Sequence, residues 1–164
     1  MKLNQLAVGE NEETRTFYAP EPGSGLASLY DRPDAPTTIT EQVHVTTLDA
    51  YVDREKIARI DLLKLDVEGW EWRALKGARR LLGEEKIGAV YFEFSPLNVF
   101  TRTFFHDLWQ VLQPAGFYFF YVDPQQGYRL RPIPEYSGEW EKFDGTSYYY
   151  AKHKNLAVEP VLVA

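Results

Sequence analysis

The hydrophobic pattern is clearest in the middle of the chain. Residues 60–67 are mostly apolar, which is typical of a strand buried on both faces of a parallel sheet. Apolar residues at helical spacing then predict one helix over residues 71–82, with Gly83 as its stop, and residues 87–94 predict the next strand. This order of strand, helix and strand predicts a βαβ unit with a right-handed crossover.

Weaker patterns flank this unit. Residues 19–40 contain four prolines and two glycines and predict a long loop, a feature that is usually functional or flexible in a compact domain. Near the C-terminal end, strands follow each other without a helix between them, so we expect an antiparallel pair at the sheet edge. Further short strands are expected over residues 3–8, 14–18, 117–122 and 146–152, with an edge strand over 41–48 and a hairpin piece over 128–131. Two further helices are expected, one over 47–58 capped by Thr47 or Asp49 and one over 103–113 with Phe104 facing inward.

Composition narrows the classes of function. A chain of 164 residues, 45% hydrophobic and 26% charged, fits one globular domain, which we place at residues 1–155 with a tail over 156–164. The absence of cysteine excludes disulfides, zinc–thiolate sites, iron–sulfur ligation and a cysteine nucleophile. The net charge of −6, without a basic stripe, argues against a nucleic-acid partner. No apolar run could span a bilayer and the start lacks a signal-peptide pattern, so we expect no membrane partner and a cytoplasmic location.

Three carboxylates follow the two central strands. Asp66 and Glu68 come after the first of these strands, and Glu93 lies at the end of the second. In open α/β sheets, ligands bind beyond the carboxyl ends of parallel strands. Asp66 alone is equally compatible with a helix cap or a turn, and Glu68 with a first-turn partner of the helix dipole. Three acids brought together require a cation, a proton or a ligand to compensate them, although no motif here demands a metal.

Other polar residues give weaker signals. Gly23 and Gly25 imitate a phosphate-binding loop, but no strand precedes them, which favours a flexible loop. His106 is expected to pack or cap a helix rather than act as a base, and Asp107 to be solvated. The run from Tyr148 to Tyr150 alternates between two faces, so we expect at least one ring in the core.

Several segments together resemble the FkbM family of methyltransferases. They are Thr47-Leu-Asp-Ala-Tyr, Ile60-Asp-Leu-Leu-Lys-Leu-Asp-Val-Glu-Gly, Glu71 with Leu75-Lys-Gly-Ala, and Tyr91-Phe-Glu. The resemblance implies an α/β class I methyltransferase fold, with a Rossmann-like sheet, helices on both faces and an antiparallel edge hairpin. It also implies S-adenosylmethionine as cofactor and O-methylation of a hydroxyl on a sugar or other small, polyketide-like natural product. Trp70 stands where the family commonly has a small residue.

The same resemblance implies a site and an incomplete sheet. For such an enzyme our hypothesis assigns Asp66, Val67 and Glu68 to the cofactor, and Asp66, Glu68 and Glu93 to catalysis, with Glu68 as the favoured base and Glu93 as a third candidate. The family's glycine-rich cofactor turn and the acid after its second strand are not found before Leu3. We therefore expect a domain lacking the first two strands, with an exposed sheet edge through which copies could associate.

Two other functions remain open from the sequence. One is a non-catalytic half-domain that binds a partner or a carbohydrate through its aromatic C-terminal half. The other is a nicotinamide-dependent α/β enzyme, which the absent dinucleotide fingerprint argues against.

Overall fold

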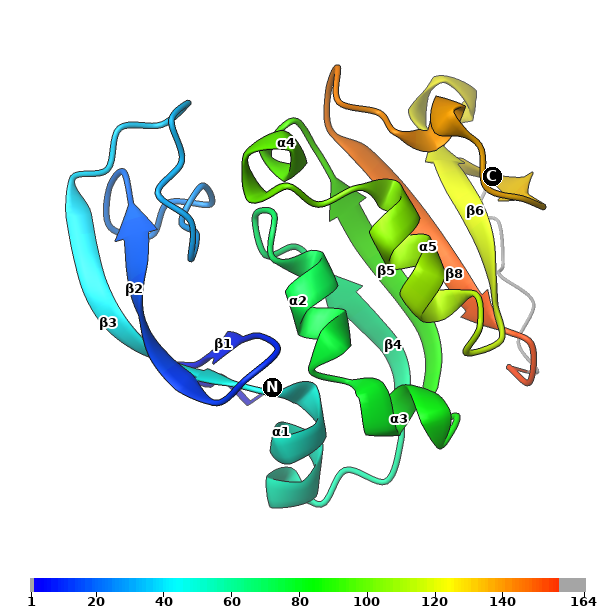
Figure 1. The fold of residues 1–164 in the computed structure, drawn as a ribbon, viewed down its shortest axis with the longest axis horizontal. Coiled ribbons are helices and arrows are strands. Elements are labelled where there is room, and N and C mark those ends of the chain that lie inside the picture. The colour runs from blue at the N-terminus through cyan, green and yellow to red at the C-terminus, as the bar shows by residue number, and fades with distance from the viewer. Residues whose placement is uncertain (1, 157–164) are drawn as a thin grey trace.

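The structure, a computed structural model, describes residues 2–156 and contains two sheets. A three-stranded sheet lies beside a five-stranded sheet, and helices pack against the larger one (Figure 1). All but the first residue of the expected tail, residues 156–164, lies outside the described residues. Among the described helices, none combines the length and the apolar character needed to cross a bilayer.

The larger sheet has the strand order β4-β5-β8-β6-β7. Strands β4 and β5 are parallel, and β8 runs antiparallel to both β5 and β6. The antiparallel pair expected from strands 117–122 and 146–152 is formed by β6 and β8. It lies inside the sheet rather than at its edge, because β7 pairs with the other side of β6. The five strands are β4 (Ile60–Leu65), β5 (Ile87–Phe94), β6 (Phe117–Asp123), β7 (Arg129–Ile133) and β8 (Ser147–His153).

The helices that pack on this sheet cover one of its faces. In Figure 1 helices α2, α3 and α5 lie in front of the strands, and α4 lies beside the upper end of β5. Along β8 the side chains alternate between buried and half-buried, as expected for a sheet covered on one side only. Helices on both faces are therefore not found within residues 2–156. The helices are α1 (Leu48–Glu55), α2 (Glu71–Lys76), α3 (Arg79–Gly83), α4 (Leu97–Thr101) and α5 (Phe105–Leu112), with 3-10 turns at Pro124–Gln126 and Gly138–Trp140.

Aromatic rings fill the core between the sheet and its helices. Tyr149 is fully buried, so the expectation of one core ring in the tyrosine run is confirmed. Its ring centroid lies 4.4 Å from that of Phe105 and 5.5 Å from that of Phe92. Its hydroxyl donates to the Trp140 carbonyl at 2.8 Å, which satisfies the polar atom inside an apolar cluster.

The central βαβ unit forms as predicted but differs in two details. Strand β4 pairs only with β5 among the described strands, so it is an edge strand rather than one buried on both faces, and Leu62 is 59% exposed. The expected helix over 71–82 is interrupted at Gly77. There the Gly77 carbonyl accepts the Asp49 amide, and the Asp49 carboxylate accepts the amides of Arg80 and Leu81, which starts a new helix.

Helix boundaries show three further corrections. Gly83 is the last residue of α3, and the left-handed residue that follows this helix is Glu85. Phe104 is 51% exposed rather than inward-facing, because it is the N-cap of α5. Asp107 is not simply solvated, since its carboxylate accepts the Phe104 amide at 2.8 Å. Helix α4 was not predicted from the sequence.

The smaller sheet consists of β1 (Ala7–Val8), β2 (Glu13–Ala19) and β3 (Ile39–Thr46). Its order is β1-β3-β2, so the strand expected at an edge lies in the middle, and the first strand is shorter than the predicted residues 3–8. Thr47 caps α1 as predicted, because its side chain accepts the Ala50 amide at 3.0 Å.

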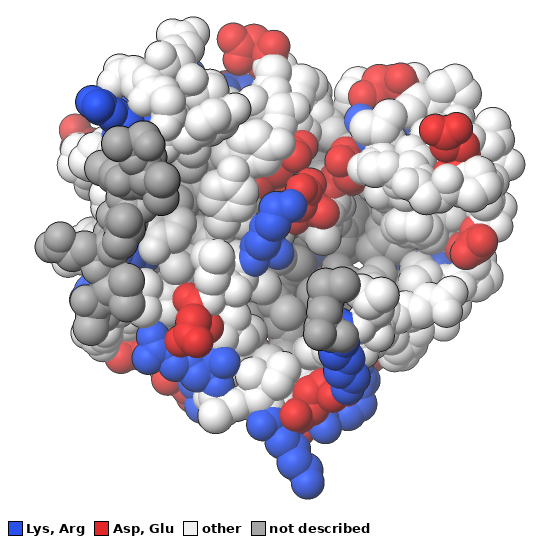
Figure 2. All heavy atoms as spheres, turned by 180° about the vertical axis from the view of Figure 1, so that it is seen from behind, with Lys and Arg blue, Asp and Glu red and all other residues white. Residues whose placement is uncertain are grey.

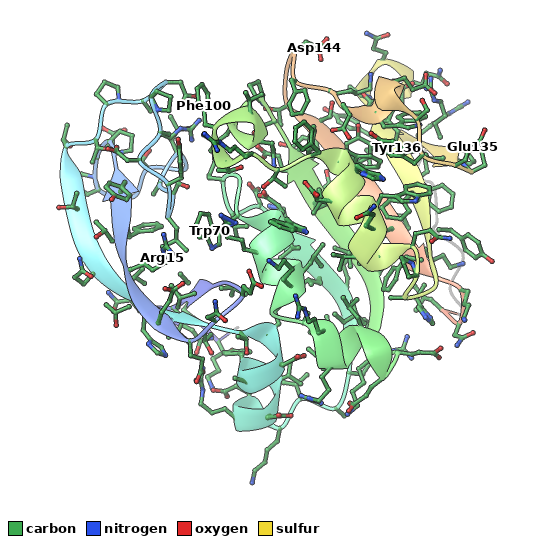
Figure 3. All side chains as sticks on the ribbon, viewed as in Figure 1. Arg15, Trp70, Phe100, Glu135, Tyr136 and Asp144 are labelled. Atoms are coloured by element: carbon green, nitrogen blue, oxygen red, sulfur yellow. The ribbon has the colours of Figure 1, made fainter. Side chains whose placement is uncertain are left out.

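Trp70 joins the two sheets. Its buried ring packs in a cluster with Leu29 and Val45. The guanidinium carbons of Arg15 and Arg73 lie 5.0 Å and 4.4 Å from the centre of the ring. Figure 3 shows Trp70 directed from the helical layer toward the smaller sheet, with Arg15 beside it. A small residue at this position would leave much of this contact unmade.

Close backbone contact between Gly9 and Gly77 supports the same junction. A Cβ atom at residue 77 would lie 2.1 Å from the Gly9 carbonyl oxygen, whereas one at residue 83 would meet no atom within 4 Å.

We predict that Gly77→Ala lowers the free energy of unfolding by about 1–3 kcal/mol, because the backbone must shift. The matched Gly83→Ala should leave stability unchanged or raise it by less than about 1 kcal/mol. Urea unfolding of both variants tests this, and equal effects would contradict it.

Candidate functional site

The turn between β4 and α2 forms the floor of the candidate site. Glu68 and Gly69 both adopt left-handed backbone angles, with φ of 52° and 85°. A Cβ atom at residue 69 would also lie 3.0 Å from the Thr101 side chain and 3.3 Å from that of Leu97, both on α4. Glycine at position 69 is therefore required by both the backbone conformation and the space.

A buried carboxylate fixes this turn from inside. Glu71, the first residue of α2, is only 1% exposed, and its Oε1 accepts the Val67 amide at 3.0 Å. Its Oε2 has no hydrogen-bond partner among the described residues. Burial raises the pKa of Glu71 to about 7, and the neighbouring Glu93 contributes in the same direction.

The three acids predicted from the sequence come together at this turn. Asp66, Glu68 and Glu93 each place one carboxylate oxygen within 4.8 Å of the other two. They lie at the carboxyl ends of β4 and β5, as the parallel pairing of those strands requires. Figure 2 shows acidic side chains gathered near the centre of this face, beside the hollow between the two sheets. Their number and separation also suit a divalent cation.

Two of the three acids have a cation of their own. The Lys64 Nζ lies 2.6 Å from Asp66 Oδ2, and the Arg32 Nη1 lies 2.7 Å from Glu68 Oε2. Asp66 raises the pKa of Lys64. Burial raises the pKa of Glu68, and the charge of Arg32 opposes that shift.

Glu93 has a different environment. Within residues 2–156 no lysine, arginine or histidine forms an ion pair with it, and it is only 9% exposed. Burial raises the pKa of Glu93 to about 7, with further contributions from the charges of Glu68 and Asp66. Next to it Tyr91 and Tyr148 stack with ring centroids 5.6 Å apart. Burial raises the pKa of both phenols.

Sequence reasoning missed the loop residues that complete the site. The Ser28 hydroxyl donates to the Glu68 carbonyl at 2.9 Å and accepts the Tyr30 amide at 3.1 Å. Arg32 also binds both carboxylate oxygens of Asp34, each at 2.8 Å. The only signals were the length of this loop and the fact that Arg32 is the single basic residue within residues 19–40. Neither indicates a contact with a residue 36 positions further along the chain.

A cavity of about 700 Å³ lies between the two sheets, next to the acids. Asp66, Val67 and Trp70 line it on the side of β4, and Ser28 and Leu29 contribute from the loop. On the side of the smaller sheet its wall consists of residues 4–8, Phe17 and residues 41–44. By contrast, His106 packs its ring on Tyr136, with centroids 4.4 Å apart, in agreement with a packing role.

The family comparison agrees with this geometry. The model of the methyltransferase FkbM domain matches residues 1–130 of the 164. This chain belongs to the FkbM methyltransferase domain family. No curated protein and no solved structure matches it. Membership of the FkbM family indicates a methyltransferase that uses a methyl donor, and it does not favour a purely non-catalytic module.

The charge on the FkbM acid cluster suits a cationic donor. The three carboxylates, together with Asp34, which shares Arg32, face two cations, Lys64 and Arg32; this leaves two negative charges uncompensated when all four acids are ionised. The adjacent cavity has room for a nucleoside-sized molecule. The residues present therefore fit the sulfonium group of a methyl donor such as S-adenosylmethionine.

The buried Glu71 predicts an unusual pH dependence of stability. Its folded pKa of about 7 exceeds the value of 4.5 for a free glutamate, so the folded state holds the proton longer. Stability is therefore full below about pH 4.5 and falls by about 1–3 kcal/mol as the pH rises through 7. Glu71→Gln should keep the Val67 contact and flatten this fall. Urea unfolding from pH 5 to 8 tests it, with the exposed Glu84→Gln as control; an unchanged slope would contradict it.

Proposed function

We propose that this FkbM domain is an S-adenosylmethionine-dependent methyltransferase that acts on a hydroxyl oxygen of a sugar or another small natural product. The observation that carries the proposal is the convergence of Asp66, Glu68 and Glu93 at the carboxyl ends of two parallel strands, beside a cavity of about 700 Å³. In a methyltransferase family, this is where donor and acceptor must meet.

The donor is assigned to the wall nearest the turn. Asp66 and Val67 line the cavity, and Glu68 follows them in the same turn, so these three residues would hold the cofactor. S-Adenosylmethionine supplies a methyl group on a positively charged sulfonium. The carboxylates stabilise that charge at close range, an effect that is stronger inside a partly buried site than in water.

The acceptor requires orientation and a base. Alignment of the hydroxyl oxygen with the methyl carbon accounts for much of the acceleration in such displacements. A carboxylate that accepts the hydroxyl proton contributes the rest, and all three acids lie close enough together to serve one acceptor oxygen. The sequence favoured Glu68 for this role.

The strand order supports a class I, Rossmann-like arrangement for this domain. Strand β8 is inserted antiparallel between β5 and β6, which are thereby parallel to each other. Among the strands that the structure describes, β1 and β4 each have a single neighbour, and the cavity lies between their sheets. Additional strands that pair with β4 would enclose the cavity further.

Ligand binding separates this proposal from a non-catalytic interaction module. We expect calorimetric titration of the folded chain with S-adenosylhomocysteine to give a micromolar Kd. Sinefungin, which carries an amine in place of the sulfonium, should bind more tightly because of the acid cluster. Asp66→Asn should reduce that preference several-fold, since it removes a charge beside the amine. Asp61→Asn serves as control, because Asp61 is 86% exposed at its side chain and lies at the opposite, amino end of β4.

A folded chain that binds neither compound would contradict the cofactor assignment and favour the interaction module. If S-adenosylhomocysteine and sinefungin bind the wild type with equal affinity, and Asp66→Asn changes neither value, the role of the acid cluster is contradicted. The assignment of the cofactor would stand.

The free edge of β4 is the second feature with a testable consequence. Its unpaired backbone groups and the exposed Leu62 favour association of copies through this edge. We expect concentration-dependent association in sedimentation velocity, weakened by Leu62→Lys. Tyr118→Lys, at an exposed site on the internal strand β6, is the matched control. A wild-type monomer at high concentration would contradict this expectation.

A further inference from the structure

We propose that Glu93 is the catalytic base of this site, and that Arg32 and Lys64 are positioning residues that engage the other two carboxylates, Glu68 and Asp66. The inference rests on the proposed function and assigns roles within the same site. The sequence favoured Glu68 as the catalytic base; here that role is given to Glu93, on the neighbouring strand β5.

The contacts of Glu68 are those of a fixed, charged group. Arg32, only 10% exposed at its side chain, donates to Glu68 Oε2 at 2.7 Å. The same guanidinium is held by Asp34 through two bonds of 2.8 Å, so it cannot swing away without breaking them. The Ser28 hydroxyl holds the Glu68 carbonyl. Protonation of Glu68 would leave the Arg32 charge buried with one carboxylate fewer.

Asp66 is engaged in a similar way, although it is more exposed. Its Oδ2 accepts the Lys64 ammonium at 2.6 Å. Lys64 lies near the end of β4, and Asp66 directly follows this strand, so the two groups are close along the chain. With Lys64 on Asp66 and Arg32 on Glu68, the two acids of the turn are each matched to a cation.

Glu93 lacks such a partner within the described residues. It is the next-to-last residue of β5 and pairs with Tyr148 of β8, so a regular strand holds its backbone. A strand positions a side chain more accurately than a turn does. The groups that face Glu93 are acids and hydroxyls: Asp66 and Glu68 from the turn, Glu71 from α2, Ser95 after its own strand, and the phenols of Tyr91 and Tyr148.

These surroundings suit a group that gains and loses a proton near neutral pH. Burial and the adjacent carboxylates raise the pKa of Glu93 to about 7, the range in which a general base is most effective at physiological pH. Glu93 takes the proton of the acceptor hydroxyl while that oxygen forms a bond to the methyl carbon. The methyl–sulfur bond breaks, its electron pair stays on sulfur as a neutral thioether, and Glu93 later releases the proton to water.

Carboxyl titration tests the arrangement without turnover. The full chain is labelled with ¹³C at the glutamate carboxyl carbons, and Glu93→Gln and Glu68→Gln assign the two resonances. In the wild type we expect Glu93 to titrate near pH 7 and Glu68 at lower pH. In Arg32→Gln the Glu68 midpoint should rise by about one pH unit or more, and that of Glu93 should fall, because a protonated Glu68 no longer repels its charge.

Two variants control for structural effects. Arg32→Lys keeps the positive charge and should restore most of the wild-type titration. Arg79→Gln removes an exposed arginine that pairs with Glu10 and should change neither midpoint. A Glu68 midpoint that is the same in the wild type and in a folded Arg32→Gln would overturn the positioning role.

Turnover tests the base directly. Transfer of a labelled methyl group from S-adenosylmethionine to a panel of hydroxylated sugars is measured from pH 5 to 9. Glu93→Gln should reduce kcat about 10²- to 10⁴-fold and abolish the rise of kcat with pH near pH 7, while retaining S-adenosylhomocysteine binding. Glu68→Gln should shift the midpoint of that rise and reduce kcat less. The reverse order of the two variants would overturn the assignment of the base.

If the proposed methyltransferase function is wrong, these experiments give a different result. A wild-type chain that neither binds S-adenosylhomocysteine nor transfers a methyl group would overturn the proposed function, and the role of Glu93 as a base with it. The carboxyl titration would in that case still decide whether Arg32 controls the protonation of Glu68.

Discussion

The hydrogen bond from the Val67 amide to the buried Glu71 carboxylate is the contact on which the site depends. It ties the end of β4 to the start of α2 across a turn in which Glu68 and Gly69 adopt left-handed angles. With the turn held in this way, Asp66 and Glu68 point toward Glu93 on the adjacent strand. The cost is a desolvated carboxylate, one oxygen of which has no hydrogen-bond partner within residues 2–156. The turn therefore fixes the position of two acids at a cost in local stability.

The sequence predicted this part of the molecule well for a physical reason. An apolar strand, an acidic turn and an amphipathic helix are local patterns, and parallel pairing of β4 with β5 then brings Glu93 beside Asp66 without further information. The break at Gly77 was not visible in the same pattern. It depends on Asp49, which caps α3 from another helix, and helical periodicity does not indicate such a contact.

The rest of the site depends on contacts between distant segments. Strand β3 has the alternating pattern of an edge strand, yet it lies in the middle of its sheet because β1 and β2 both pair with it. Arg32 reaches Glu68 from a loop that has no periodic pattern. Hydrophobic periodicity identifies buried faces, but it cannot indicate which charged side chain of a long loop will meet a given acid. The partners of the acids were therefore found only in the structure.

The junction between the two sheets links the loop chemistry to the acid cluster. Trp70 directly follows Gly69 in the acidic turn, and its ring packs on Leu29 and Val45 of the smaller sheet and its loop. Ser28 and Arg32, which contact Glu68, lie in that same loop. A rotation of the smaller sheet would thus move Arg32 relative to Glu68. Because Trp70 and the close approach of Gly9 to Gly77 resist such a rotation, packing at the junction helps to keep Arg32 in contact with Glu68.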